Sequence, residues 1–400
     1  MVKYFIQMEN IIPFSITDLA KVTNHRSGEV KFGDGPDLFN PDTYIDQKEQ
    51  KKMDRFIHFA IAGAEQAIAD SGWKVPNEEQ AYRTGVMIGS GIGGLPSIQK
   101  TAILAQEKGA KRISPFFIPA SLINLASGQV SIKHQFMGPN HAVVTACATG
   151  SHAIGDSARM IAFGDVDVMV CGGSEATICE IGIGGFASLR ALSTNFNDRP
   201  TEASRPWDKD RDGFVMGEGA GALVLETLAH AQQRNATIYA EIVGGGMTAD
   251  AYHLTAPHPE GLGACNVMKV ALEDAGMVPS DIDYINVHGT STPLGDIAES
   301  KAILSVFGEN TYNLNISSTK SMTGHLLGGA GAIEALACIL AVSEDIIPPT
   351  INHFMDDPEF DPNLNFTFNV AQKRTVRAAL SNTFGFGGHN GSVIFKKFED

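Results

Sequence analysis

Cysteines are few in this 400-residue sequence, and they are scattered. The five are Cys147, Cys171, Cys179, Cys265 and Cys338. An odd number without close spacing predicts neither a disulfide framework nor a zinc site, and it indicates a reducing compartment. The sequence contains no run of about 18 uncharged apolar residues, so no membrane-spanning helix is predicted. Met1–Asn10 is too short for a signal peptide.

Positive charge is also scarce. The sequence has 30 Lys and Arg against 45 Asp and Glu, which gives a formal net charge of −15. This balance argues against nucleic acid as a partner. The hydrophobic share of 43% allows a large core, and the 42 glycines suit a fold with many tight turns. The length predicts two or three domains.

Strands and helices alternate along the chain, which predicts an α/β fold with mostly parallel or mixed sheets covered by helices. A weak internal repeat supports a duplication: residues 67–72 resemble residues 271–276, and each precedes a strand and a glycine loop. We predict two halves, 1–240 and 241–400, that pack with one helix layer between two sheets.

The first glycine loop, residues 89–94, has the spacing of a dinucleotide-binding loop. A lone match is weak evidence, and the loop at the corresponding place in the second half carries His288. We therefore predict that this loop is a turn common to both halves and that it binds no dinucleotide.

Cys147 lies in residues 141–155, where an apolar stretch precedes it and small residues and a helix-like segment follow. We predict a strand-to-helix turn that exposes the thiol. The helix N-terminus would favour the thiolate, which suits an acyl-accepting nucleophile. The alternative is a buried structural cysteine.

Two histidines disfavour that alternative. His288 and His325 each follow a predicted strand and are flanked by glycines, which indicates side chains aimed at one point. Lys320 follows the same strand as His325. Glu334 lies in a stretch that is otherwise apolar all round, which predicts a buried carboxylate that needs a partner. Lys320 is the candidate, and a solvent-facing Glu334 is the alternative.

Together with residues 203–214 and 382–392, these segments resemble the β-ketoacyl-[acyl carrier protein] synthases, and synthase II most closely. The resemblance runs from about Ile11 to Lys397. It implies a thiolase-like fold, in which two duplicated βαβαβαββ-type halves form a five-layer α-β-α-β-α sandwich with the site between them. It also implies an acyltransferase that elongates fatty acyl chains by two carbons.

The resemblance assigns the acyl thioester to Cys147. When the malonyl group loses carbon dioxide, negative charge develops on its thioester oxygen, and neutral imidazoles of His288 and His325 would stabilise it. A histidine acting as general base for the thiol is the alternative. The resemblance also implies an oxyanion hole made by the backbone N–H groups of Cys147 and Phe386. The resemblance further implies that the Phe386 side chain acts as a gate over the acyl pocket. The alternative is that Phe386 is an ordinary core residue.

The partner implied by the resemblance is an acyl carrier protein, whose phosphopantetheine arm would contact Thr290 and Thr292. Ordinary turn chemistry is the alternative for these threonines. Because carrier proteins are acidic, docking needs a local basic patch, although such charges usually form a solvated face. The candidates are Lys48, Lys51, Lys52, Arg55, Lys111 and Arg112. The resemblance implies a homodimer. We predict no metal and no cofactor of its own, and a location in the bacterial cytoplasm or alternatively in an organelle.

The start of the chain departs from the family, which opens with a strand and a glycine turn. Residues 241–247 are the counterpart in the second half, and Val2–Met8 could fill the place but lacks the glycines. The rival interpretations are a synthase I, a non-catalytic subunit of the chain-length-factor kind and an inactive scaffold. The paired histidines disfavour a synthase III or a thiolase.

Overall fold

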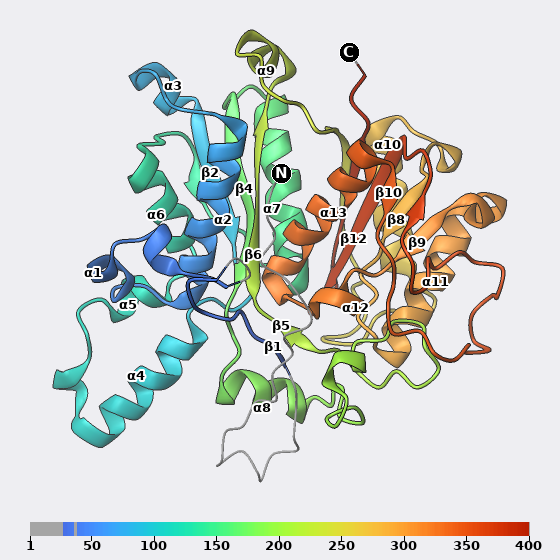
Figure 1. The fold of residues 1–400 in the computed structure, drawn as a ribbon, viewed down its shortest axis with the longest axis horizontal. Coiled ribbons are helices and arrows are strands. Elements are labelled where there is room, and N and C mark those ends of the chain that lie inside the picture. The colour runs from blue at the N-terminus through green and yellow to red at the C-terminus, as the bar shows by residue number, and fades with distance from the viewer. Residues whose placement is uncertain (1–26, 36–37, 400) are drawn as a thin grey trace.

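Two mixed β-sheets with helices between and outside them make up the computed structural model, which describes residues 27–35 and 38–399 (Figure 1). The first sheet contains, in order, β3 (Asn140–His141), β2 (Thr84–Gly89), β4 (Val168–Glu175) and β6 (Gly219–Glu226). The second contains β7 (Glu241–Ala249), β13 (His389–Lys396), β12 (Ala378–Gly385), β8 (Tyr284–Asn286) and β9 (Asn315–Ser317).

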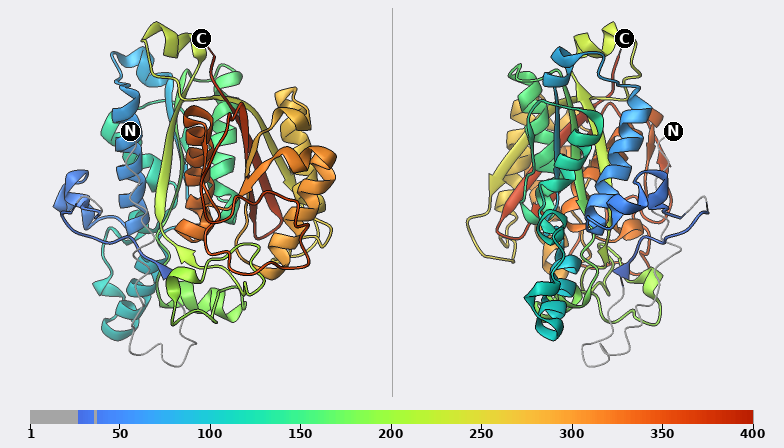
Figure 2. Two further views of the ribbon diagram at one scale, coloured as in Figure 1. Left: turned by 45° about the vertical axis from the view of Figure 1, so that its right-hand side comes forward. Right: turned by 90° about the vertical axis from the view of Figure 1, so that its left-hand side faces the viewer.

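Helices form three layers around these sheets, so the predicted five-layer sandwich is confirmed. Two helices, green and dark orange, stand between the sheets in the left view of Figure 2. They are α7 (Thr149–Ala162) and α13 (Ala330–Glu344). The first sheet is covered outside by α2 (Arg55–Ser71) and α6 (Leu125–His134), and the second by α10 (Leu262–Ala275) and α11 (Pro293–Phe307).

Shorter elements connect these layers. The remaining helices are α1 (Gln47–Gln50), α3 (Glu78–Tyr82), α4 (Leu95–Lys108), α5 (Phe117–Ser121), α8 (Glu180–Ser188), α9 (Leu228–Gln233) and α12 (Lys320–Thr323). Two small ladders join β1 (Ser27–Gly28) to β5 (Met216–Gly217) and β10 (Ile346–Ile347) to β11 (Gln372–Lys373). Helix α4 extends away from the body at the lower left of Figure 1, and none of its residues is buried.

The two sheets are built alike. In the first, β2 pairs parallel with β3 and β4, and β4 pairs antiparallel with β6. In the second, β8 pairs parallel with β9 and β12, and β12 and β13 form an antiparallel pair. Strand β7 then continues the second sheet beyond β13. Among the described residues, no strand takes that place beside β6 in the first sheet, and Val2–Met8 lies outside the described range.

Small residues let the middle helices touch. A Cβ added at Gly150 of α7 would lie 2.6 Å from the backbone nitrogen of Ala332 in α13. A Cβ at Gly221 of β6 would lie 2.8 Å from the carbonyl carbon of Ala332. Because backbones approach this closely, the segments that carry the reactive residues of the two halves can meet.

The strand expected before Cys147 is shorter than predicted. Strand β3 contains only Asn140 and His141, both exposed, and the apolar residues after them are outside any strand. The reason lies in Ile88 of β2. Its N–H and C=O, which would extend the ladder, bond to the hydroxyl of Ser127 at 2.8 and 3.2 Å instead.

One segment, Leu327–Glu344, is long and apolar enough to cross a membrane by composition. It comprises α13 and the turn before it, and 72% of it is buried inside the protein. A core helix passes the same test, so this segment is weak evidence for a membrane span.

Candidate active site

A cavity of about 420 Å³ lies where the two halves meet. Cys147 reaches it from the first half, in the one-turn helix Ala146–Ala148 that leads into α7. From the second half come the imidazoles, whose ring centroids lie 5.2 Å apart with planes at 88°. The predicted site residues that line it are Cys147, His288, Thr290, Thr292, His325 and Phe386.

The thiol of Cys147 is almost completely buried, with 7% of the residue exposed. Burial raises the pKa of this thiol to about 12, and the charge of Lys320 and the backbone N–H of Phe386 oppose that shift. The thiolate expected from the helix N-terminus is therefore wrong for the resting site, because loss of water around the sulfur outweighs the favourable contacts.

Phe386 follows β12 at the point where this strand meets the nucleophile. Its backbone N–H donates a hydrogen bond to Sγ of Cys147. A Cβ at the preceding Gly385 would lie 2.6 Å from the carbonyl oxygen of Thr145, so only glycine lets the strand come this close. The Phe386 ring lies 6.2 Å from that of Phe186, across the cavity lining.

Both histidines are neutral in this setting. Burial lowers the pKa of His288 and of His325 well below the usual value, and the positive charge of Lys320 adds to both shifts. A neutral imidazole keeps one N–H to donate and one nitrogen to accept. The Nδ1 atoms of the two rings make no hydrogen bond to the described residues.

Lys320 and Glu334 lie behind the histidines, outside the cavity lining. Nζ of Lys320 donates to Oε1 of Glu334 in an ion pair whose side chains are 1% and 0% exposed. Glu334 projects from α13 into the core, so its carboxylate does not face solvent. The pair places a positive charge near the imidazoles and the thiol.

The loop carrying Thr290 and Thr292 is fixed through Ser291 between them. The two threonine hydroxyls lie 3.0 Å apart. Ser291 has a φ of 70°, its Oγ accepts the backbone N–H of Arg205 at 3.0 Å, and its C=O accepts the N–H of Gly213. Residues 203–214, singled out in the sequence, therefore hold this loop in place.

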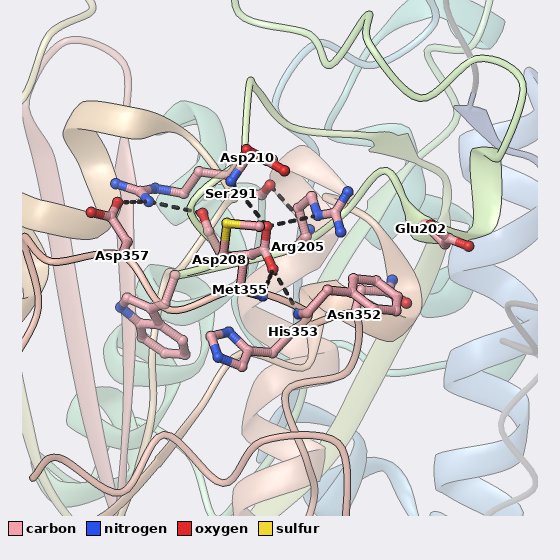
Figure 3. Close-up of polar contacts among 12 residues, drawn as sticks. Glu202, Arg205, Asp208, Asp210, Ser291, Asn352, His353, Met355 and Asp357 are labelled. Atoms are coloured by element: carbon pink, nitrogen blue, oxygen red, sulfur yellow. Dashed lines mark hydrogen bonds and ion pairs between the residues drawn. The ribbon is translucent and has the colours of Figure 1, made fainter. Parts of the chain in front are cut away.

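A carboxylate anchors residues 203–214 in turn. Oδ2 of Asp208 accepts the backbone N–H groups of Phe354 and Met355 at 2.7 and 2.8 Å (Figure 3). Arg205 lies 3.2 Å from Oδ1 of the same residue. Asp208 is 0% exposed, so it ties two crossing loops together below the threonines.

Sequence reasoning missed Glu299 and Arg190. Glu299 accepts the backbone N–H groups of His288 at 2.9 Å and Gly289 at 2.8 Å, and burial raises its pKa to about 7. The sequence pattern that could have identified Glu299 is a carboxylate at an inward-facing position of α11. Arg190, exposed and with a φ of 54°, lines the cavity mouth and had no motif to mark it.

The basic residues expected to dock a carrier divide into two kinds. Lys48, Lys51 and Lys52 lie in or directly after α1, and Lys111 and Arg112 lie in the exposed turn after α4. Nζ of Lys52 is 5.3 Å from the centroid of the Phe116 ring, four residues after Arg112 in the chain, and it also pairs with Glu49. Arg55 instead pairs with the buried Glu218 at 2.9 Å.

Metal ligands are not grouped at this site. Among residues 27–35 and 38–399, no three His, Cys, Asp or Glu side chains lie together as a metal site would need. All five cysteines are free thiols.

Two family models match the chain. The description of the first is Beta-ketoacyl synthase, N-terminal domain, over residues 11–231, and that of the second is Beta-ketoacyl synthase, C-terminal domain, over residues 239–354. The chain belongs to the β-ketoacyl synthase family. It is thus a condensing enzyme of the acyltransferase class with a thiolase-like fold, which confirms both predictions.

Curated relatives are similar over most of the chain. The 3-oxoacyl-[acyl-carrier-protein] synthase 2 of Rhizobium meliloti is 52% identical over 390 residues, 97% of this chain and 91% of the relative. That of Coxiella burnetii is 52% identical over 362 residues, 90% and 86% of the two chains. The mitochondrial 3-oxoacyl-[acyl-carrier-protein] synthase of Arabidopsis thaliana is 50% identical over 92% of this chain and 79% of the relative.

Solved structures share the fold. A type II PKS acyl-carrier protein in complex with its ketosynthase gives a TM-score of 0.87 at 30% identity, over 97% of this chain and 92% of that one. A β-ketoacyl synthase from Burkholderia phymatum gives 0.85 at 34% identity, over 96% and 91%.

Proposed function

We propose that this protein is a synthase II, which condenses a malonyl group from an acyl carrier protein with an acyl group held on Cys147. One observation carries the proposal: a thiol from one half and two neutral imidazoles from the other open into a single cavity. The curated relatives named synthase 2 favour this type over synthase I.

Acyl transfer comes first. Sγ of Cys147 attacks the carrier thioester and forms a carbon–sulfur bond, the bond from the acyl carbon to the carrier sulfur breaks, and the proton of Cys147 passes to the departing carrier thiolate. The negative charge on the carbonyl oxygen is held by the backbone N–H groups of Cys147 and Phe386. Because the resting group is a thiol, this step moves one proton for each acyl group transferred.

Condensation follows when the emptied carrier is replaced by malonyl carrier, which makes the kinetics ping-pong. Loss of carbon dioxide leaves an enolate, and the N–H groups of His288 and His325 stabilise its oxygen. The enolate carbon then attacks the acyl carbonyl, the bond from that carbon to Sγ of Cys147 breaks, and the released thiolate takes up a proton from water to restore the thiol. Lys320, paired with Glu334, keeps the imidazoles neutral and ready to donate.

The acyl carrier protein docks over the basic residues, and its phosphopantetheine arm passes Thr290 and Thr292. This arm belongs to the carrier, so the enzyme needs no cofactor of its own. Lys48, Lys51, Lys111 and Arg112 are exposed, which supports a place for them in the docking patch. Arg55 acts through its pair with Glu218 and supports this patch from below.

We also propose a homodimer formed through the exposed edge of β3 and the segment after it. Apolar side chains are also exposed on α4 and at the start of α5, including Ile98, Phe116 and Ile118, which are 40%, 41% and 59% exposed. A second copy would cover them. The proposed location is the bacterial cytoplasm, with an organelle as the alternative in keeping with the plant relative.

The test is intact-protein mass spectrometry after incubation with a long-chain acyl carrier protein, followed by malonyl carrier. We expect an acyl adduct that Cys147→Ala lacks and that malonyl carrier discharges as a ketoacyl product two carbons longer. A folded protein that forms no adduct contradicts the proposal and favours a non-catalytic subunit.

A further inference from the structure

The glycine loop after β2 has a use that the reaction above does not include. Its donors converge on the carboxylate of Glu175, the last residue of β4, which is 0% exposed. They are the N–H of Gly91 at 2.8 Å, the hydroxyl of Ser90 at 2.8 Å, and the N–H groups of Ile92 and Gly93 at 3.3 Å each. The chain's own carboxylate thus occupies the place where such a loop would hold a phosphate.

The second half of the molecule supplies a fifth donor. The backbone N–H of Gly328, three residues after His325, donates to Oε2 of Glu175 at 3.0 Å. All five partners donate, so both carboxyl oxygens act as acceptors. Burial raises the pKa of Glu175, and the hydrogen bonds from Ser90 and from the backbone N–H groups oppose that shift. Glu175 therefore joins the first-half loop to the turn that carries His325.

The turn that carries the nucleophile packs against this cluster through Ala146. A Cβ added at Gly91 would lie 2.8 Å from Oε2 of Glu175, and 3.3 Å from both the carbonyl oxygen of Ala146 and the nitrogen of Gly328. Ala146, next to Cys147, has a φ of 50°. A left-handed conformation costs a residue with a side chain about 1–2 kcal/mol, so its surroundings must hold it.

Charge connects the same groups. Burial is the largest cause of the raised pKa of the Cys147 thiol; the charge of Lys320 opposes it, and the carboxylate of Glu175 adds to it. The other ionisable groups around the thiol are Glu334, which also raises that pKa, and the neutral imidazoles of His288 and His325.

We propose that Glu175 is a positioning residue for the condensation: it fixes the turn of Cys147 against the turn of His325. The proposal rests on the proposed function, because the spacing of these turns matters only if acyl and malonyl groups meet there.

The test is Glu175→Gln, which keeps the size of the side chain, removes its charge and turns an NH₂ group toward N–H donors. The first readout is the pH profile of Cys147 alkylation by iodoacetamide, followed by intact mass. We expect its midpoint to move to lower pH, and each unit of that shift raises the thiolate fraction about tenfold. The second readout is condensation, whose kcat should fall about 10- to 100-fold with the KM for carrier unchanged.

Faster alkylation together with slower condensation separates positioning from loss of fold. Glu226→Gln is the matched control, because this half-buried carboxylate of β6 pairs with Arg234 far from the thiol. It should lower thermal stability and move neither readout. Glu175→Asp keeps the charge, so it should lower kcat without shifting the alkylation midpoint, which makes it the second variant if Glu175→Gln does not fold.

The proposal is overturned if folded Glu175→Gln has the alkylation midpoint and kcat of the unmodified protein, or if Glu175→Asp shifts the midpoint as Glu175→Gln does. Failure of the proposed function gives a different result. The unmodified protein would then form no acyl adduct, while its alkylation profile, which needs no acyl substrate, could still be compared with those of the variants.

Discussion

The loops after β2 and β8 occupy corresponding places in the two halves, but only one presents side chains to the reaction. In both, backbone N–H groups bond a buried carboxylate: Glu175 receives those of the first loop and Glu299 those of the second. The second loop begins with His288 and continues with Thr290, whereas the first begins with Ser90 and glycines. The duplicated fold supplies the same turn twice, and the side chains on it decide which copy does chemistry.

The carboxylates also differ in origin. Glu299 comes from α11, the helix that its own loop enters, and so stabilises one half internally. Glu175 comes from the neighbouring strand β4 and reaches Gly328 in the other half. The catalytic loop is therefore held from within, and the loop without catalytic side chains joins the halves.

The two sheets also differ in the strands at one edge. The second has β7 beside β13, while the described part of the first ends at β6. A groove of about 1090 Å³ borders β6, lined by apolar residues of α2, α7 and α13. Cys147 follows β3, which lies at the opposite edge of the first sheet from β6, so the site lies away from this groove.

Replacing either histidine of the second half should have the largest effect, and it should affect the condensation step more than the loading of Cys147. In His288→Asn or His325→Asn, loading of Cys147 should persist, because the oxyanion donors for that step are backbone N–H groups. Discharge by malonyl carrier should fall about 10²–10³-fold, as when an oxyanion donor is lost. Single-turnover mass spectrometry of the acyl adduct measures both steps. Loss of loading in these variants would assign a histidine to activation of the thiol.

Breaking the buried pair in the second half should have the next largest effect. Glu334→Leu leaves the charge of Lys320 buried without a partner, which should lower the free energy of unfolding by about 3–5 kcal/mol. The double variant Lys320→Met/Glu334→Leu should recover much of that loss, since no charge remains buried. Urea unfolding measures both. Equal losses in the single and double variants would mean that cavity formation outweighs the charge.

The sequence, through its resemblance to a family, predicted the five layers and six of the residues that line the cavity. Cys147, His288 and His325 could be found because each stands in a continuous motif beside a strand. The division at residues 240 and 241 stays a prediction, as do the roles of the threonines.

What the sequence did not predict depends on contacts between distant segments. Glu175 has partners in two loops of different halves and no pattern of its own. The raised pKa of Cys147 comes from burial by both halves, which no local motif encodes. The short β3 results from one hydroxyl, that of Ser127, taking the place of a strand.

Glu299→Gln should distinguish the role of Glu299 from that of Glu175. A glutamine has one oxygen to accept two N–H groups, so one donor at His288 or Gly289 loses its partner, at a cost of about 1.5–3 kcal/mol. Discharge by malonyl carrier should fall about tenfold or more, with the alkylation profile of Cys147 unchanged. Glu175→Gln should shift that profile.

The pH dependence of stability gives a second measure of Glu299. Its pKa rises from 4.5 to about 7 on folding, so the folded protein keeps a proton that the unfolded chain releases between these values. The stability from this proton is fully present below pH 4.5 and is lost as the pH rises through about 7. Thermal unfolding across this range should show a smaller fall in Glu299→Gln, and an unchanged profile would assign the proton elsewhere.

The smallest effect is expected at the threonines, which the first loop lacks. Thr290→Val keeps the shape of the side chain and removes one hydroxyl, so it should cost about 0.5–1.5 kcal/mol of carrier binding. That corresponds to a rise of about two- to tenfold in the KM for malonyl carrier, with kcat nearly unchanged. Thr290→Ser keeps the hydroxyl and should restore the KM. If the serine variant behaves like the valine variant, the methyl group matters and not the hydrogen bond, and Thr290 then serves the turn and does not bind the arm.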